Sequence, residues 1–437
     1  MNKTLIKDAL IITLDYNQPD YFYGDILVCE DTIEKITNHP EEIDKKRADQ
    51  VIDGSNLMIM PGLVNTHGHA AMSILRGYAD DLPLKKWLET KIWPIEAMLE
   101  SDDVYWGAML SIAEMIKGGT TTFTDMYYYM DRVAEASAES GIRAVLSRGM
   151  LGLDFDLEKG FEDTETLIND WHGAKNGRIK VMLGPHSAYV GGSDFLGRVY
   201  DLASETGLPI QVHLAETRDE VDGCRSEQGC SSTAMLSKIG ILDFKVVAAH
   251  CVHLSDDDID ILADKKVGVS HNPGSNLKLG SGIAPIKRLL DRGIKVGLGT
   301  DGAASNNNLD MIEEMRLAAL ISKGATMDPT VVNAKTALLM AAPMGADILG
   351  LEETGILKPG YKADIIGLRR NRLHLTPLHD PLAHLVYASA AADVSLVMVD
   401  GRLLLEDGAL KTLDEEKIRA EASHRAERLV NAGKDNK

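Results

Sequence analysis

Cysteine is scarce in this chain of 437 residues. The four thiols, Cys29, Cys224, Cys230 and Cys251, form neither a Cys-x-x-Cys pair nor a dense framework. Thiolate metal sites and disulfide-stabilised domains need such patterns, so neither is expected. The scarcity fits a reducing compartment, and we expect the protein to be cytoplasmic.

Clusters of basic side chains are missing as well. The formal net charge is −20 at pH 7, spread along the chain without a basic run or an acidic tail. Because phosphate backbones are bound by clustered lysine and arginine, we expect no nucleic-acid partner. The negative charge is best explained as a property that keeps the protein soluble.

Long apolar runs are the third absence. The first residues, MNKTLIKDALIITLD, alternate like a strand, and their apolar run is too short for a signal peptide. No later segment approaches the roughly 18 consecutive apolar residues that a membrane span needs. We therefore expect neither a targeting segment nor a membrane partner. The hydrophobic share of 44% is still large enough for a sizeable core.

The two ends of the chain resemble each other in their short strand patterns and turn signals. The patterns are ALIITL, DILVCE and TIEKI near the start, and ADIIGL, SLVMVDG and RLLLEDG near the end. We expect residues 1–60 and 357–437 to form one small β-sandwich domain. The tail from about Leu413 is charged with apolar spacing, which predicts a surface helix.

Strand and helix patterns alternate in the middle of the chain, which is typical of parallel βα units. The eight strand patterns are LMIMPGLVNTH, TTTFTDM, IRAVLSRG, IKVMLGPH, PIQVHLAE, VVAAHCVHL, KVGVSHN and KVGLGTDG. Eight units suit a (β/α)8 TIM-like barrel, which typically needs about 250 residues, and we assign residues 61–356 to it. The predicted class is α/β. An open doubly wound sheet is the alternative, but no G-x-G-x-x-G follows the first strand.

Residues 70–117, between the first two strands, form a segment too long for an ordinary βα loop. Its last part, SDDVYWGAMLSIAEMIKGG, predicts a helix with Ser101 as N-cap and Gly118 just past its end. The preceding part contains Trp87 and Glu96. Segments of this size are usually lids or binding elements, so both side chains are candidates for ligand contact.

Ligand-type side chains follow strand after strand of the predicted barrel. The first strand ends in His67 and His69, which share a face because they are two residues apart. The ends of later strands carry His186, His213, His250, His271 and Asp301. Barrel enzymes place their chemistry at these ends, and a carboxylate buried behind an apolar strand needs a partner. Imidazoles with one carboxylate suit a divalent cation, with Zn2+ as first choice and Fe2+ as second.

Glu216 follows His213 by three residues in the motif HLAE. On a regular strand Glu216 would face away from His213, because side chains alternate between the two faces. The strand must therefore end near His213 for Glu216 to enter the site. A solvated Glu216 is the alternative.

Five motifs, in this order and at this spacing, resemble the amidohydrolase superfamily and specifically its deaminase and chlorohydrolase branch. They are PGLVNTHGH, QVHLAET, VVAAHCVHL, VSHNPGSNLKLGSG and GLGTDGAASNN, and the resemblance extends to ILKPGYKADI. It implies that the metal is held by His67, His69, His213 and Asp301. It further implies that Glu216 shuttles protons and that His250 contacts the water held by the metal.

The fourth strand bears on the number of metal ions. Binuclear members of the superfamily carry a carboxylated lysine on this strand. Here the strand ends in PHSAY with His186. One metal ion per subunit is therefore expected.

A closer resemblance is to the 5-methylthioadenosine and S-adenosylhomocysteine deaminases, on HGHAAMSILRGYADDLPLKKWLETKIWPIEAML, LSRGM and LGPHSAY. By this comparison Glu96 accepts hydrogen bonds from ribose hydroxyls, Trp87 packs on the ligand and His186 contacts the nucleoside. Arg148 would meet the carboxylate of the longer substrate, because a guanidinium suits that group. Ser305 is a further candidate for ligand contact.

The expected reaction is hydrolytic deamination of the adenine ring in 5'-modified adenosines, which gives the inosine analogue and ammonia. A metal-activated hydroxide would attack the adenine ring. Glu216 would protonate the ring and Asp301 would take the proton of the water, so both carboxylates are also expected to contact the substrate. His250 would stabilise the adduct. The sequence does not rank S-adenosylhomocysteine, 5'-methylthioadenosine and adenosine.

Two alternatives stay open. Another amidohydrolase, such as a guanine deaminase or an s-triazine hydrolase, would use the same scaffold, but Glu96 with Trp87 favours a ligand that contains ribose. A metal-free assembly protein is disfavoured, because all ligands and the acid are present. The oligomeric state, a homo-oligomer included, and the roles of His253 and His271 are also left open.

Overall fold

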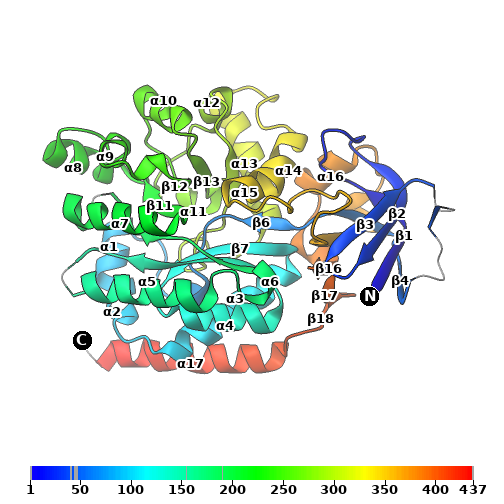
Figure 1. The fold of residues 1–437 in the computed structure, drawn as a ribbon, viewed down its shortest axis with the longest axis horizontal. Helices are drawn as coiled ribbons and strands as arrows, with labels where there is room; N and C mark the ends of the chain where they lie inside the picture. The colour runs from blue at the N-terminus through cyan, green and yellow to red at the C-terminus, as the bar shows by residue number, and fades with distance from the viewer. Residues whose placement is uncertain (1, 40–41, 44–47, 154, 189, 436–437) are drawn as a thin grey trace.

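Two β-sheets organise the protein, and strands from both chain ends form the second of them (Figure 1). A computed structural model describes residues 2–39, 42–43, 48–153, 155–188 and 190–435. The helix-covered barrel fills most of Figure 1, and the sheet of the chain ends lies at its right. The predicted α/β class is confirmed.

The barrel sheet is parallel, with strand order β10-β8-β7-β6-β14-β13-β12-β11 and β9 beside β8. Its strands are β6 (Leu63–Asn65), β7 (Thr120–Tyr127), β8 (Arg143–Met150), β9 (Ile179–Val181), β10 (Gly184–Pro185), β11 (Ile210–Leu214), β12 (Val246–His250), β13 (Gly268–His271) and β14 (Val296–Leu298). The bridges Leu183–Ile210 and Ser187–His213 join the two ends of this order, so the sheet closes. Since β9 and β10 share one predicted strand, the (β/α)8 prediction is confirmed.

The barrel strands are buried on both faces. Every residue of β7, TTTFTDMY, and of β8, RAVLSRGM, is buried. Helices cover the outside of a parallel barrel and side chains fill its inside, so an alternating apolar pattern is not required. Burial on both faces explains why the barrel strands give apolar runs in the sequence.

Helices follow most of the barrel strands and form the outer layer (Figure 1). They are α3 (Ser101–Lys117), α4 (Met130–Ser140), α5 (Leu157–Trp171), α6 (Ala174–Gly177), α7 (Gly192–Thr206), α8 (Arg218–Gln228), α9 (Ser232–Ile239), α10 (Asp256–Asp264), α11 (Pro273–Lys278), α12 (Ile286–Asp291), α13 (Met311–Thr326), α14 (Ala334–Ala341) and α15 (Pro343–Ile348). Short helices precede α3 in the long segment after β6, namely η3 (Ala70–Leu75), α1 (Leu84–Trp87), the π-helix η4 (Leu88–Ile92) and α2 (Trp93–Glu96).

Helix α3 has its N-cap one residue before the predicted cap. Glu100 is the N-cap, and its backbone N–H donates to Asp103 Oδ2 at 2.8 Å. The prediction of Ser101 is therefore wrong, because a carboxylate three residues further on satisfies the N–H of Glu100. Gly118 is the first residue past the helix, as predicted.

The sheet of the chain ends has the strand order β18-β17-β16-β15-β5-β1-β2-β3, with β4 beside β1. Its strands are β1 (Lys3–Ile11), β2 (Phe22–Cys29), β3 (Thr32–Thr37), β4 (Gln50–Asp53), β5 (Leu57–Pro61), β15 (Ile365–Arg369), β16 (Val394–Val399), β17 (Arg402–Glu406) and β18 (Ala409–Leu410). Helix α16 (Pro381–Tyr387) lies between β15 and β16 in the chain. The pairing of β5 with β15 and β1 brings the two chain ends together.

The predicted first barrel strand, residues 57–67, is divided between the two sheets. Its first part is β5 and its second part is β6, so the prediction of one continuous strand is wrong. Gly62 separates them, and its N–H donates to Asp364 O at 3.0 Å. A Cβ at Gly62 would lie 2.0 Å from Thr121 Oγ1, so only glycine permits this close crossing between sheets.

The C-terminal helix α17 (Glu415–Asp435) runs along the bottom of Figure 1 beneath the barrel. Lys117 Nζ lies 2.7 Å from Glu415 Oε2, and Arg428 Nη1 lies 3.2 Å from Glu100 Oε1, so ion pairs join α17 to both ends of α3. The helix predicted in the tail is therefore present and lies on the surface of the barrel.

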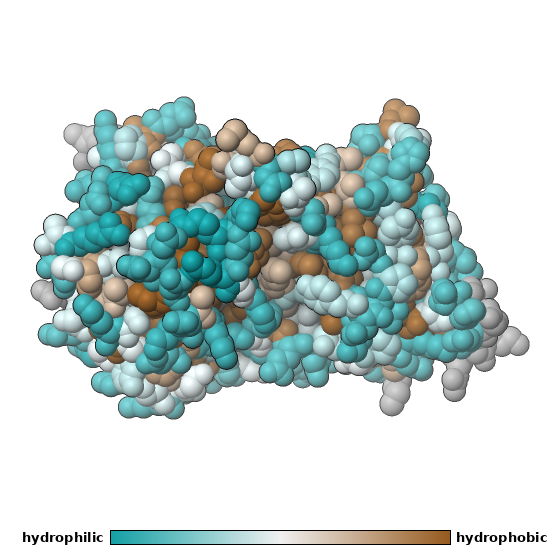
Figure 2. Space-filling model, turned by 90° about the horizontal axis from the view of Figure 1, so that it is seen from above, coloured by the Kyte–Doolittle hydropathy of each residue, from teal (hydrophilic) through white to brown (hydrophobic). Residues whose placement is uncertain are grey.

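The outer surface carries mixed polarity. In the view of Figure 2, hydrophilic and hydrophobic side chains are interspersed over the visible face. Of the helices in the described parts of the chain, none has both the length and the apolar character required to cross a bilayer.

Candidate active site

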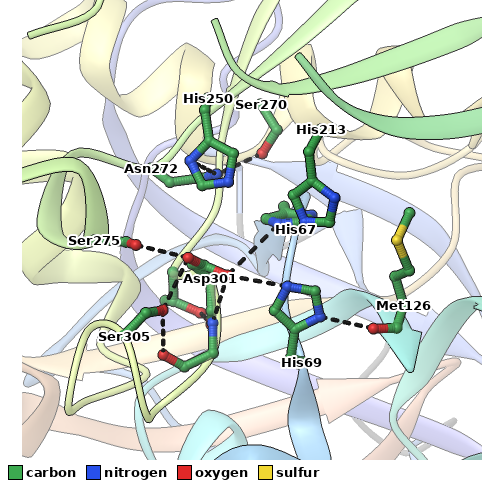
Figure 3. Close-up of polar contacts among 12 residues, drawn as sticks. His67, His69, Met126, His213, His250, Ser270, Asn272, Ser275, Asp301 and Ser305 are labelled. Carbon is green, nitrogen blue, oxygen red and sulfur yellow. Dashed lines mark hydrogen bonds and ion pairs between the residues drawn. The ribbon is translucent and has the colours of Figure 1, made fainter. Parts of the chain in front are cut away.

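Four imidazoles and one carboxylate point toward one another at the carboxyl ends of the barrel strands (Figure 3). His67 and His69 follow β6, His213 belongs to β11, His250 ends β12 and Asp301 follows β14. One ligand atom from each of His67, His69 and His213 lies within 4.8 Å of the others, and the same holds for His67, His250 and Asp301. Residues far apart in the chain thus form one buried cluster.

The segment after β6 holds its two histidines outside the strand. β6 ends at Asn65, and Thr66 N donates to Leu298 O of β14 at 2.8 Å. The ring centroids of His67 and His69 are 5.0 Å apart, with an interplanar angle of 83°. The two rings therefore converge through a loop anchored to the last barrel strand, rather than through a shared strand face.

Hydrogen bonds orient two of the imidazole rings. His69 Nδ1 donates to Met126 O and His213 Nδ1 donates to His186 O, each at 2.7 Å. A ring that donates through Nδ1 keeps a lone pair on Nε2, which is the usual arrangement of metal-ligating histidine. The backbone carbonyls of neighbouring strands therefore fix which nitrogen faces the cluster.

His67 presents a buried nitrogen to the cluster. Its Nδ1 lies 3.1 Å from Gln211 Nε2, whereas its Nε2 is buried without a hydrogen-bond partner among the described residues. A buried polar atom of this kind costs free energy unless a ligand satisfies it. The orphaned Nε2 therefore supports a cation at this position.

Hydrogen bonds from serine hydroxyls surround the Asp301 carboxylate. Oδ2 accepts hydrogen bonds from Ser275 Oγ at 2.6 Å and from Ser305 Oγ at 2.8 Å. Oδ1 lies 3.2 Å from His69 Nε2 and 3.5 Å from His67 Nε2. The serines hold one oxygen in place and leave the other directed at the imidazoles.

The charges of these groups match a cation-binding site. Burial lowers the pKa of His67 and His213 well below its usual range, so both rings are neutral. Burial also opposes charge on His69, but its hydrogen bond with Asp301 outweighs this effect and raises the pKa to about 9. The Asp301 carboxylate thus favours positive charge at this place, and a cation bound to Nε2 would take the place of that proton. For Asp301 burial favours the neutral acid, yet His69 and the other imidazoles hold the pKa well below its usual range. An ionised carboxylate among imidazoles fits zinc-type or iron-type cations.

Glu216 enters the cluster because β11 ends early. The strand ends at Leu214, and Ala215 takes a φ of 52°, which breaks the alternation of side chains. The Glu220 carboxylate accepts hydrogen bonds from Ala215 N at 3.0 Å and from Glu216 N at 2.8 Å, which stabilises this turn. Glu216 Oε1 accepts a hydrogen bond from Ser281 Oγ at 3.5 Å, and burial raises the pKa of Glu216.

His250 faces Glu216 from the next strand. Its Nε2 lies 3.9 Å from Glu216 Oε2, and its Nδ1 lies 2.9 Å from Asn276 Oδ1. His250 has a φ of 72°, which is rare for a residue with a side chain and costs free energy. The left-handed backbone and Asn276 together aim the ring at the cluster.

A cavity of about 1740 Å³ is lined by residues of α1, η4, α2, α5, α8 and the end of β8. Glu96, Arg148 and His186 lie on its wall, as does Trp93, whose side chain is 49% exposed. Trp87 is packed into the hydrophobic core instead and is 4% exposed. The sequence suggested Trp87 as the tryptophan that contacts a ligand, whereas Trp93 is the one on the cavity wall.

Tyr127 holds the Glu96 carboxylate. Tyr127 ends β7, and its hydroxyl donates to Glu96 Oε1 at 2.6 Å. Burial raises the pKa of Glu96, while the hydrogen bond from Tyr127 favours the ionised form. Glu96 Oε1 is therefore fixed to the barrel, and the carboxylate has a defined orientation on the cavity wall.

The two histidines without an assigned role lie beside the cluster. His253 Nε2 donates to Ser281 O at 2.7 Å and so positions the serine that contacts Glu216. His271, the last residue of β13, is buried, and burial lowers its pKa to about 3. Neither belongs to the two ligand sets that centre on His67.

Several residues that support the site were not singled out from the sequence. They are Tyr127, Gln211, Glu220, Ser275 and Asn276. Gln211 lies two residues before His213 on β11, so the strand period could have placed it on the same face. The other four belong to β7, α8 and α11, and no periodic pattern in the sequence indicates which residues they contact.

Comparisons with known proteins agree with this geometry. The amidohydrolase family matches residues 58–404. The 5-methylthioadenosine/S-adenosylhomocysteine deaminase of Dictyoglomus thermophilum is 52% identical over 385 residues, 88% of this chain and 90% of the relative. The enzyme of the same name from Pelotomaculum thermopropionicum is 48% identical over 99% of this chain and 100% of the relative.

A solved structure has the same fold. The adenosine deaminase from Xanthomonas campestris, with bound zinc, superimposes with a TM-score of 0.93 and 30% identity over 98% of both chains. The relatives from Dictyoglomus thermophilum and Pelotomaculum thermopropionicum are identical to this chain at about half of the aligned positions, over most of the length of both proteins. This similarity establishes common ancestry and a common fold. The chain belongs to the amidohydrolase family and, within it, to the 5-methylthioadenosine/S-adenosylhomocysteine deaminases.

Proposed function

We propose that this protein hydrolyses the amino group of adenine in 5'-modified adenosines and releases ammonia and the inosine analogue. The observation that carries the proposal is the convergence of His67, His69, His213 and Asp301 beside Glu216 and His250. A large cavity lies next to this cluster, because its wall includes His186 and Ser281, which contact His213 and Glu216. Membership in a family of deaminases that act on such nucleosides supports it.

One divalent metal ion per subunit is proposed, held by His67, His69, His213 and Asp301. Zinc is the first choice, because neutral imidazoles with one carboxylate suit it, and iron is the second. When bound, such a cation makes hydroxide available from water near neutral pH. Metal analysis of the purified protein, followed by removal with a chelator and titration with Zn2+ or Fe2+ monitored by calorimetry, distinguishes the two metals.

Glu216 is proposed as the group that moves protons. Its raised pKa supports a protonated carboxyl that donates to the ring nitrogen as the carbon bearing the amino group is attacked. Asp301 accepts the proton of the attacking water. As the adduct collapses, the ionised Glu216 takes the remaining proton of the attacking oxygen and passes it to the departing amino group, which leaves as ammonia. The proton on Asp301 then restores the acid form of Glu216. His250, 3.9 Å from Glu216, hydrogen-bonds to the new oxygen and stabilises the adduct.

The cavity wall is proposed to bind the nucleoside. Glu96 would accept hydrogen bonds from ribose hydroxyls, and His186 would contact the nucleoside. Trp87 was predicted to pack on the ligand; with Trp87 in the core, Trp93 is the tryptophan on the wall that supports this role. Ser305 would act on the substrate through Asp301, to which its hydroxyl donates at 2.8 Å.

Ammonia release tests the proposed reaction. The metal-loaded protein is incubated separately with adenosine, 5'-methylthioadenosine, S-adenosylhomocysteine, guanine and an s-triazine. Ammonia from the adenosines, with formation of the inosine chromophore, supports the proposal. Release from guanine or the triazine alone would replace it with another reaction of the same scaffold.

The proton role of Glu216 is tested by Glu216→Gln, which keeps the shape but cannot exchange a proton. We expect turnover to fall roughly 10²-fold or more, as general acid–base groups usually contribute, with an unchanged metal content. Glu227→Gln is the matched control, because it removes a cavity carboxylate from an exposed position of α8. Near-normal turnover of a metal-replete Glu216→Gln protein would remove Glu216 from the mechanism.

A further inference from the structure

Two serine hydroxyls hold one oxygen of Asp301, and they come from different segments of the chain. Ser275 belongs to α11, which follows β13, and Ser305 lies in the loop between β14 and α13. Their hydroxyls donate to Asp301 Oδ2 at 2.6 and 2.8 Å. In Figure 3 both serines lie on the left of Asp301, whereas His67 and His69 lie on its right. The orientation of the carboxylate therefore depends on how these two segments are held relative to each other.

Glu314 of α13 connects the two segments, and its side chain is fully buried. Its Oε2 accepts a hydrogen bond from Gly274 N at 3.0 Å, and its Oε1 accepts one from Asn306 Nδ2 at 2.8 Å. Gly274 directly precedes Ser275, and Asn306 directly follows Ser305. One carboxyl group therefore holds the two residues that lie next to the serines.

Close packing keeps Glu314 against both segments. A Cβ at Gly274 would lie 2.3 Å from Glu314 Oε1, so any side chain at position 274 would displace the carboxyl group. Asn306 Nδ2 also donates to Thr300 O at 2.9 Å, and Thr300 directly precedes Asp301. The connection from Glu314 therefore reaches the backbone beside Asp301 as well as the serines that hold its side chain.

Glu314 acts on the site through these hydrogen bonds rather than through its charge. Burial raises the pKa of Glu314 to about 8, so the group is mostly uncharged at pH 7. Among the described residues its hydrogen bonds go to Gly274 and Asn306, and none goes to an imidazole of the cluster. An effect of Glu314 on the cluster at neutral pH must therefore pass through the two segments.

We propose that Glu314 is a positioning residue for Asp301. It holds the two serine hydroxyls against Oδ2 and thereby keeps Oδ1 directed at the imidazoles. The inference rests on the proposed function, in which Asp301 is both a ligand of the metal and the acceptor of a proton. Loss of Glu314 should lower the affinity for the metal and kcat, while KM changes little, because the cavity wall binds the nucleoside.

Glu314→Gln tests the proposal at pH 7, because an amide has one acceptor oxygen and can hold only one of the two segments. We expect the affinity for Zn2+, measured by competition with a chelating dye, and kcat for 5'-methylthioadenosine at saturating Zn2+ each to fall roughly fivefold, below the loss usual for a direct partner of a metal ligand. Glu114→Gln is the matched control. Its carboxylate accepts a hydrogen bond from Leu309 N at 3.1 Å in the same loop after β14, but contacts neither serine among the described residues.

A double-mutant comparison separates positioning from a purely structural role. In a protein with both Ser275→Ala and Ser305→Ala, the hydroxyls through which Glu314 acts are missing. Glu314→Gln should then lower neither the affinity for Zn2+ nor kcat any further. An equal fall with and without the serine hydroxyls, or unchanged values in Glu314→Gln itself, would overturn the proposal.

Asn306→Ala provides a second variant that keeps the buried carboxyl group. It removes only the connection toward Ser305, so the affinity for Zn2+ and kcat should fall by a smaller factor than in Glu314→Gln. Unchanged values in Asn306→Ala would also contradict the proposal. Affinities for Zn2+ that fall as expected in a protein that releases no ammonia from any adenosine would support the positioning of Asp301 and reject the proposed reaction.

Discussion

Strand β8 carries a buried arginine near each of its ends, and the two differ in what their ion pairs join. Arg143, at the amino end, lies 2.8 Å from Asp364 through Nε, and its Nη2 contacts both Asp364 and Asp400. Arg148, near the carboxyl end, contacts Asp156 and Asp163. Both guanidinium groups thus meet two aspartates, but only Arg148 lies on the cavity wall.

In (β/α)8 barrels the catalytic residues lie at the carboxyl ends of the strands, whereas residues at the amino ends contribute to stability. The two arginines of β8 follow this arrangement. The partners of Arg143 come from the sheet of the chain ends, more than 200 residues away. Its bidentate pair with Asp364 is buried on both sides and ties the barrel to that sheet. The partners of Arg148 come from the loop and helix directly after β8, and one of them is partly exposed to the cavity.

The largest expected effect comes from Arg143→Met. Removal of the cation leaves the buried Asp364 and partly buried Asp400 carboxylates without their main partner, which should lower the free energy of unfolding by about 3–5 kcal/mol. Urea denaturation measures this loss, and the kcat/KM of the protein that remains folded should be unchanged.

Arg148→Met provides the comparison for that variant. Asp163 is 33% exposed and keeps Lys159 as a partner, so the free energy of unfolding should fall by less than in Arg143→Met. Equal losses of stability in the two variants, or a loss of activity in folded Arg143→Met, would contradict the view that Arg143 serves stability and Arg148 serves the cavity.

A pH-dependent effect on stability is expected from a buried acid that has no such cation. Glu314 on α13 accepts hydrogen bonds from Gly274 N at 3.0 Å and from Asn306 Nδ2 at 2.8 Å, and burial raises its pKa to about 8. The unfolded chain releases this proton near pH 4.5, whereas the native state keeps it until about pH 8. The free energy of unfolding should therefore fall as the pH rises between these values, by at most about 1.4 kcal/mol per pH unit.

Glu314→Gln tests this dependence, because the amide stays neutral at every pH. Urea denaturation from pH 5 to 8.5 should give a flatter curve for Glu314→Gln than for the unchanged protein. Glu313→Gln changes the exposed neighbour on the same helix, whose charge adds only a minor part to the raised pKa of Glu314, and should flatten the slope far less. Parallel curves for all three proteins would show that Glu314 does not hold a proton in the native state.

The barrel could be predicted from the sequence because strands buried on both faces leave apolar runs, and turns and helices separate these runs. The division of residues 57–67 between two sheets could not be predicted in this way. Every residue of β5 and β6 is buried, and both belong to one apolar run. Gly62 alone marks the crossing, and its role depends on the approach of Thr121 from β7.

The histidines and Asp301 were accessible to prediction because parallel strands gather their carboxyl ends at one place. The cavity wall was harder to predict, because the rotation of short helices decides which side chain faces inward. Trp87 and Trp93 are separated by the π-helix η4, which changes the register between them. The pairing of Tyr127 with Glu96 spans 31 residues and has no periodic signature.

The smallest effect expected at the carboxyl end comes from Tyr127→Phe. The variant removes the hydroxyl that donates to Glu96 Oε1 at 2.6 Å, and Tyr127 pairs with Arg148 at the end of β8 opposite to Arg143. One such hydrogen bond contributes about 1 kcal/mol, so KM for 5'-methylthioadenosine should rise roughly fivefold, while kcat changes less. The 2',3'-dideoxy analogue, which offers no ribose hydroxyls to Glu96, should show little change in KM. Tyr128→Phe is the matched control, because among the described residues its hydroxyl makes no hydrogen bond with Glu96. An equal rise in KM for both nucleosides would mean that Tyr127 supports the shape of the cavity in general and does not orient Glu96 toward ribose.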